Sequence, residues 1–126
     1  MITITEDYVS FETSKLLKEK GFDEKCFALY NPDGMLIQSG IRLNNTQVGR
    51  VEGSYSAPTL QMAMKWLREA HNVFISITYE NDGVFTANLK VPLKGVDCMI
   101  DDKHNCWLTY EETCEEAIKY TLENLI

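Results

Sequence analysis

The sequence lacks a long hydrophobic run and a surplus of positive charge. Among its 126 residues, 44% are hydrophobic and 25% are charged. This balance excludes a disordered chain, a collagen-like chain and a membrane span. Lysine and arginine number 12 against 19 acidic residues, so the net charge is −7. A general nucleic-acid binder needs excess Lys and Arg to displace counterions, so we expect no direct nucleic-acid binding.

Short motifs for cofactors and metals are also lacking. The cysteines Cys26, Cys98, Cys106 and Cys114 form no C-x-x-C pair, which argues against a zinc ribbon and a thioredoxin-like site. Neither G-x-G-x-x-G nor G-x-x-x-x-G-K-[ST] is present, so no phosphate-binding loop and no cofactor are expected. The first seven residues have no basic or apolar segment typical of a signal peptide. We therefore expect a cytoplasmic protein with four reduced thiols.

The length fits a single domain, residues 1–126. A helix is predicted from Ser10, a good N-cap, to Gly21, which can take the left-handed conformation that ends a helix. A hairpin follows, in which Cys26–Tyr30 and Met35–Gln38 flank the turn Asn31-Pro-Asp-Gly34. The stretch 41–56 has little periodicity, and indicates either a loop or a bulged edge strand around Gln47–Glu52.

The second half repeats the alternation of helix and hairpin. A helix begins near Ala57-Pro58-Thr59, with the proline in its first turn, and reaches Asn72. Period-two alternation predicts strands at Val73–Tyr79 and Phe85–Val91, joined by a turn at 81–83, and a short hairpin between 96 and 108. A last helix starts at Thr109, which forms a capping box with Glu112. These elements predict an α+β fold, in which an antiparallel sheet built from hairpins is packed by three helices in two layers.

Three segments carry a resemblance to a known family. They are the Ser10–Phe22 segment SFETSKLLKEKGF, the Ala57–Glu69 segment APTLQMAMKWLRE with His71, and the Tyr110–Ile126 segment YEETCEEAIKYTLENLI. Together they resemble small uncharacterised proteins of prophages and mobile elements in gut anaerobes. The resemblance implies a cytoplasmic accessory protein encoded by such an element, and it implies no catalytic residues.

One cluster of possible metal ligands lies near the end of the chain, at Asp97, Cys98, Asp101, Asp102, His104 and Cys106. Its spacing fits no standard zinc pattern, and a polar turn uses the same residue types, so we expect no metal. If a metal does bind, Cys98, His104 and Cys106 are the ligands to test.

Two residues of the second helix are candidates for binding. His71 lies at its C-terminus, where a cation complements the helix dipole, and it could alternatively act as a general base in a cleft. Trp66 borders an apolar stripe formed by Leu60, Ala63, Met64, Leu67 and Ala70. This helix is apolar over most of its circumference, which favours a homodimer with Trp66 near the interface over a compact monomer.

The leading hypothesis is a non-enzymatic, phage-related accessory protein that binds itself or a phage or host protein. One alternative is an acidic inhibitor that mimics DNA, because Glu111, Glu112, Glu115, Glu116 and Glu123 share the last helix. Another is a small hydrolase that depends on His71, His104 or a metal.

Overall fold

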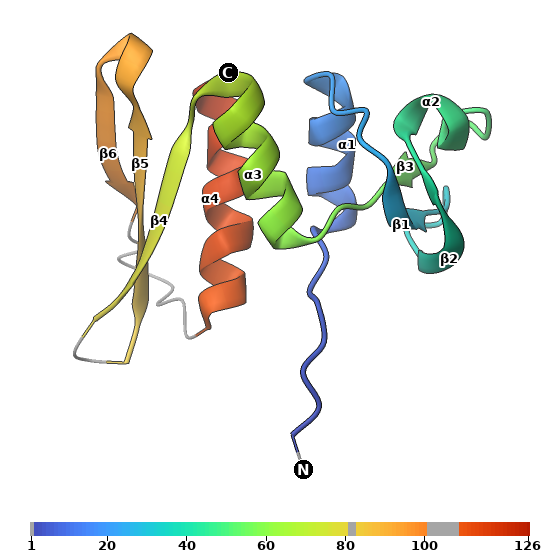
Figure 1. The fold of residues 1–126 in the computed structure, drawn as a ribbon, viewed down its shortest axis with the longest axis horizontal. Coiled ribbons are helices and arrows are strands. Elements are labelled where there is room, and N and C mark those ends of the chain that lie inside the picture. The colour runs from blue at the N-terminus through green and yellow to red at the C-terminus, as the bar shows by residue number, and fades with distance from the viewer. Residues whose placement is uncertain (1, 81–82, 101–108) are drawn as a thin grey trace. The chain divides into compact units, whose positions relative to one another are not determined.

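The structure, a computed structural model, describes residues 2–80, 83–100 and 109–126. The chain divides into two compact units, Met1–Met62 and Ala63–Ile126. Each unit contains a three-stranded antiparallel sheet, and the described residues form four α-helices (Figure 1). The predicted α+β class is confirmed. The strands form two sheets rather than one, and the single-domain expectation stays a prediction.

The first unit begins with a capped helix. Helix α1 (Phe11–Glu19) starts after Ser10, whose hydroxyl accepts a hydrogen bond from the Thr13 backbone at 3.2 Å. It ends as predicted, because Gly21 has a φ of +94°, a conformation that costs glycine little. Phe22 then donates its backbone N–H to the Leu17 carbonyl at 2.9 Å, which closes the helix end.

The sheet of the first unit has the order β2-β1-β3. Strands β1 (Cys26–Tyr30) and β2 (Leu36–Leu43) form the predicted hairpin, and the register between them shifts between Cys26 and Ala28. The Asn31 carboxamide oxygen holds the turn by accepting hydrogen bonds from the backbone N–H groups of Asp33 and Met35. Strand β2 continues five residues beyond the predicted end at Gln38.

The structure of residues 41–56 differs from the edge strand that the sequence offered as one of two alternatives. In place of an edge strand around Gln47–Glu52, it contains the short helix α2 (Asn45–Val48), a turn, and the two-residue strand β3 (Tyr55–Ser56). Asn44 and Gln47 form a capping box that starts α2. The buried Asn45 side chain donates to the Phe22 carbonyl and accepts from the Ser56 N–H, both at 2.8 Å.

Helix α3 (Leu60–His71) begins in the first unit and continues into the second. It starts later than predicted, so Pro58 precedes the helix instead of lying in its first turn. Thr59 acts as the cap, because its hydroxyl accepts the Met62 N–H at 3.1 Å. Asn72, with φ 56°, ends the helix.

The second unit has an antiparallel sheet with the order β4-β5-β6 and one long helix on it. Its elements are β4 (Phe74–Tyr79), β5 (Phe85–Val91), a 3-10 turn η1 (Pro92–Lys94), β6 (Val96–Ile100) and α4 (Tyr110–Asn124). Thr109 caps α4, and its hydroxyl accepts the Glu112 N–H at 3.0 Å. The predicted turn residues 81–82 and the second half of the hairpin at 96–108 lie outside the described residues.

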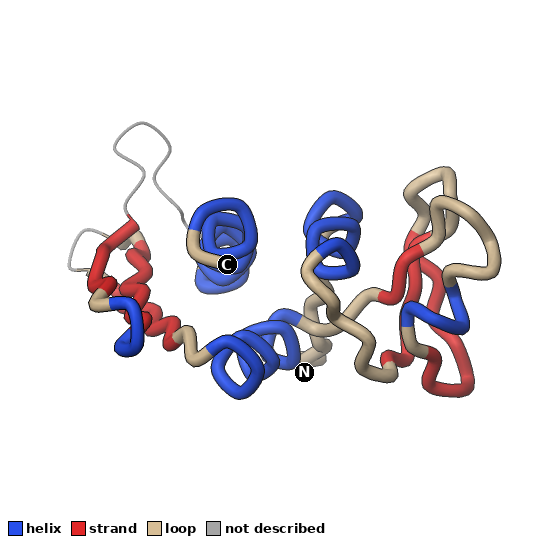
Figure 2. Tube along the Cα trace, turned by 90° about the horizontal axis from the view of Figure 1, so that it is seen from above, coloured by secondary structure: helices blue, strands red, loops and turns tan. Residues whose placement is uncertain are grey.

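The two faces of this sheet differ in polarity. Helix α4 packs against β4 and β5 (Figure 2), where Ala117 contacts the buried Ala87 and Leu89. The residues that alternate with these, such as Ser76 and Asn88, are exposed. The second unit is therefore a two-layer arrangement with one solvated sheet face. None of the helices in the described part of the chain has the length and apolar character needed to cross a membrane.

Candidate functional site

The structure brings the two predicted binding residues together. The rings of Trp66 and His71 meet edge to face, with their centroids 4.7 Å apart. Both side chains are half-buried. His71 is in the last turn of α3 beside Arg68, as the helix-dipole interpretation expects. A general base also needs a reacting group nearby, and this pair supplies none by itself.

The predicted metal ligands are described only in part. Cys98 is half-buried on β6 and packs against the core beneath α4. His104 and Cys106 lie outside the described residues. Among residues 2–80, 83–100 and 109–126, no three potential ligands lie close enough to hold a metal.

The acidic face of α4 contains a basic residue at its centre. Glu112, Glu116, Lys119 and Glu123 follow one another at helical spacing. Glu116, Lys119 and Glu123 line one shallow depression with Ile100 and Tyr120. A DNA mimic presents an uninterrupted row of carboxylates in place of phosphates, and Lys119 divides this row. The DNA-mimic hypothesis stays a prediction.

An exposed group of large apolar side chains lies on the first hairpin. We call it the β1–β2 patch: Phe27, Met35, Leu36, Ile37 and Ile41, whose exposed fractions are 55%, 64%, 37%, 41% and 65%. Soluble proteins expose single apolar residues routinely, whereas several large ones on one hairpin favour an interaction surface.

The strand pairing shows which residues of the patch share a face. Along β1, Cys26, Ala28 and Tyr30 are buried, whereas Phe27 lies on the opposite face. Leu29 pairs with Ile37 of β2, which places Ile37 on the same face as Phe27, whereas Leu36 pairs with Tyr30 and lies on the other face. Strand β2 is also an edge strand in the order β2-β1-β3, so one side of its backbone has no neighbouring strand among those described.

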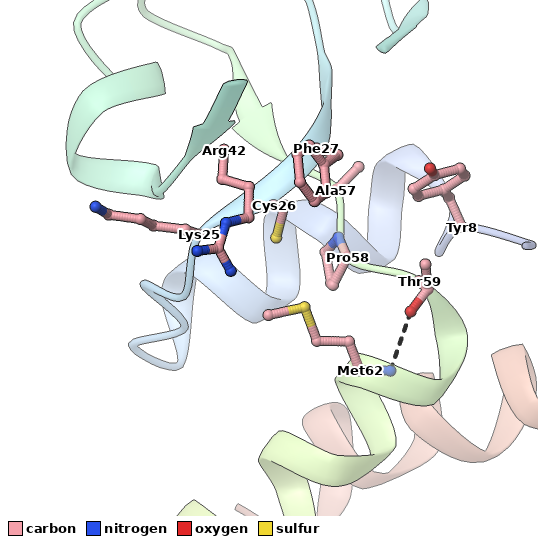
Figure 3. A pocket seen from close by; sticks show the side chains of 9 residues that line it. All are labelled: Tyr8, Lys25, Cys26, Phe27, Arg42, Ala57, Pro58, Thr59 and Met62. Carbon is pink, nitrogen blue, oxygen red and sulfur yellow. Dashed lines mark hydrogen bonds between the residues drawn. The ribbon is translucent and has the colours of Figure 1, made fainter. Parts of the chain in front are cut away.

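A pocket of about 170 Å³ opens next to this patch, entirely within the first unit (Figure 3). Its apolar walls come from β1, from the segment before α3 and from the first turn of α3: Cys26, Phe27, Ala57, Pro58 and Met62. Its polar lining consists of Tyr8, Lys25, Arg42 and Thr59. Pro58 and the Thr59 cap lead the chain into α3 beside the start of β1, where the pocket lies.

The charged groups at the pocket are cationic. Figure 3 shows the Arg42 guanidinium beside Cys26 and near the end of the Met62 side chain, while the Lys25 ammonium points away. The Arg42 guanidinium lies 5.8 Å from the centroid of the Phe27 ring. Within the described chain, Arg42 forms no ion pair with a carboxylate. The pocket therefore has apolar walls and one planar cation, the Arg42 guanidinium.

The Cys26 thiol is a poor nucleophile. Burial raises its pKa from 9.0 to about 11; the neighbouring Ser56 hydroxyl lowers it by less, and the Glu24 charge raises it slightly. A thiol reacts through its thiolate, so Cys26 stays protonated and inert at neutral pH. The pocket can bind, but its chemistry does not favour covalent catalysis. Cys98 and Cys114 are also free thiols, whereas Cys106 lies outside the described residues.

Sequence reasoning identified neither the patch nor the pocket. The pocket residues come from four separate stretches of chain, between Tyr8 and Met62, and no local motif links them. One signal was available in the sequence: Leu36-Ile-Gln-Ser-Gly-Ile-Arg-Leu43 contains four aliphatic residues and a single charge. A strand of that composition at a sheet edge predicts an exposed apolar surface.

Comparison with protein-family models, with curated proteins and with solved structures finds no match to this chain in any of the three.

Proposed function

We propose that this protein is a non-enzymatic accessory protein that works by self-association through the β1–β2 patch. The observation that carries the proposal is the exposure of five large apolar side chains on one hairpin. Burying one such side chain stabilises an interface by up to about 1.5–3 kcal/mol. Exposing these five side chains to water therefore has a free-energy cost, and burying them against a partner surface would remove it.

The charge distribution is compatible with a second copy as the occupant. Residues 1–62 carry six basic and eight acidic side chains, a net charge of −2, whereas residues 63–126 carry six and eleven, a net charge of −5. The β1–β2 patch itself contains no charged residue, and the Arg42 guanidinium lies 5.8 Å from the centroid of its Phe27 ring. Two copies of an acidic chain repel each other. This repulsion is weaker between two copies of the first unit than between two copies of the second unit, because the first carries less net charge. A two-fold axis through the face of the patch that holds Phe27 and Ile37 would place the same apolar residues on both sides.

Sedimentation velocity across a range of concentrations tests the proposal. We expect the wild-type mass to rise from one copy towards two as concentration increases. Ile37→Lys places a charge in the patch, and we expect it to stay monomeric throughout. Leu93→Lys is the matched control, because Leu93 is 86% exposed but lies in η1, outside the patch.

Two results would overturn the proposal: a wild-type monomer at every concentration, or equal dissociation by Leu93→Lys and Ile37→Lys. A Trp66→Ala variant separates the patch from the interface predicted on the second helix. We expect its dimer affinity to match that of the wild type, whereas an interface at Trp66 requires weaker association.

A further inference from the structure

The pocket beside the β1–β2 patch combines three features that the self-association proposal does not use. Its volume is about 170 Å³, on the order of six water molecules at ~30 Å³ each. Its walls are formed by apolar groups from Ala57, Pro58 and Met62. Its inward-facing charge is the Arg42 guanidinium, which no carboxylate of the described chain neutralises.

We propose that this pocket binds a small carboxylate with a compact apolar body, of the size of an aromatic acid. The planar guanidinium presents a fork of N–H groups that matches the two oxygens of a carboxylate. Contact with the Phe27 ring limits the orientations of the guanidinium, so less freedom is lost when the anion binds. The apolar body then lies against Pro58 and Met62, away from water.

The pocket size and the charge set the ligand class. Ligand sites for drug-sized molecules measure about 300–1,000 Å³, so this pocket is too small for a nucleotide or a coenzyme. An apolar wall alone would accept a neutral molecule equally well, whereas an unpaired arginine selects an anion. The carboxylate and the apolar body are both required, since each contacts a different part of the pocket.

Titrations followed by amide NMR shifts test this proposal, with benzoate as the probe. Benzamide is the neutral analogue, and acetate is the carboxylate without an apolar body. We expect saturable shifts at residues 26–27, 42, 57 and 59–62 with benzoate, and binding at least about tenfold weaker with benzamide and with acetate.

Two variants complete the test. Arg42→Gln removes the guanidinium, and we expect it to weaken benzoate binding about tenfold. Arg50→Gln is the control, because Arg50 is exposed in the same unit but does not line the pocket. The mass and melting temperature of each variant show whether a change in binding reflects a change in association or in folding.

The proposal fails if benzoate gives no saturable shifts at these residues. It also fails if benzamide binds as tightly as benzoate, or if Arg42→Gln and Arg50→Gln behave alike. A monomeric wild type that still binds benzoate would overturn the self-association proposal and leave the pocket proposal intact.

Discussion

The phenol of Tyr30 donates a buried hydrogen bond of 2.6 Å to the backbone carbonyl of Val9. This bond joins the centre of the first sheet to the segment that precedes α1. Phe11 reinforces the junction, since its ring meets the Tyr30 ring edge to face at 5.6 Å. The junction thus combines one short polar contact with an aromatic pair.

We expect Tyr30→Phe to lower the free energy of unfolding by about 1–2 kcal/mol, because the buried Val9 carbonyl loses its donor. Urea denaturation measures the change. Tyr55→Phe is the control: Tyr55 keeps its ring contacts with Phe11 and Lys18, and its hydroxyl has no hydrogen-bond partner among the described residues. Equal effects of the two substitutions would contradict the role given to the Tyr30 hydroxyl.

Asn45 is a second polar group with a structural role in the first unit. Asn45→Ala removes two buried hydrogen bonds, one to the Phe22 carbonyl and one from the Ser56 N–H. We expect a loss of about 2 kcal/mol or more in unfolding free energy. Asn124→Ala, which removes one exposed bond to Tyr120, should change stability by less than about 0.5 kcal/mol. A small effect at Asn45 would mean that water replaces both bonds.

Gly21→Val tests the end of helix α1. A side chain at Gly21 meets no atom within 4 Å, so the cost comes from the positive φ alone. We expect destabilisation of about 1 kcal/mol or more in thermal unfolding. Gly40→Val also places a side chain in open space, but without a positive φ, and should be nearly neutral. Stability unaffected by Gly21→Val would place the end of the helix elsewhere.

Two buried thiols predict how stability depends on alkaline pH. Burial is the main reason that the pKa of Cys26 and that of Cys114 rise from 9.0 to about 11. A raised pKa means that the folded state favours the neutral thiol more than the unfolded state does. This contribution is therefore complete below about pH 9 and is lost as the pH rises to about 11.

Denaturation curves between pH 7 and 11 measure this dependence. We expect Cys26→Ala to lose less stability than the wild type over the alkaline part of that range, whatever its stability at pH 7. An identical slope for both proteins would show that the Cys26 thiol does not titrate with folding.

Local chemistry made much of the fold predictable. Ser10 and Gly21 bound α1, and the Asn31–Gly34 turn sets the first hairpin, because each signal acts within a few residues. Helix α2 was not predicted, since four residues show no helical period. Its position depends on Asn45, whose partners are 23 and 11 residues away in the sequence.

The candidate sites were less predictable than the fold. The apolar pattern of the second helix drew attention to Trp66, whereas the large exposed apolar group is on β1 and β2. Exposure depends on which strand is at the sheet edge, and no periodicity reveals strand order. The pocket depends on bringing Arg42 next to Pro58 and Met62, which only the folded chain does.

The pairing of Tyr8 with Thr59 has a consequence for the order of events during synthesis. The Val9 N–H donates to the Pro58 carbonyl, and the Leu60 N–H donates to the Asp7 carbonyl. On a ribosome, residues 7–9 emerge early and must wait for residues 58–60 before these bonds can form. Helix α1 and the first hairpin can form sooner, because their contacts are local. Closure of the first unit is therefore a late step in its assembly, and until then the Val9 N–H and the Asp7 carbonyl lack the partners that the folded chain gives them.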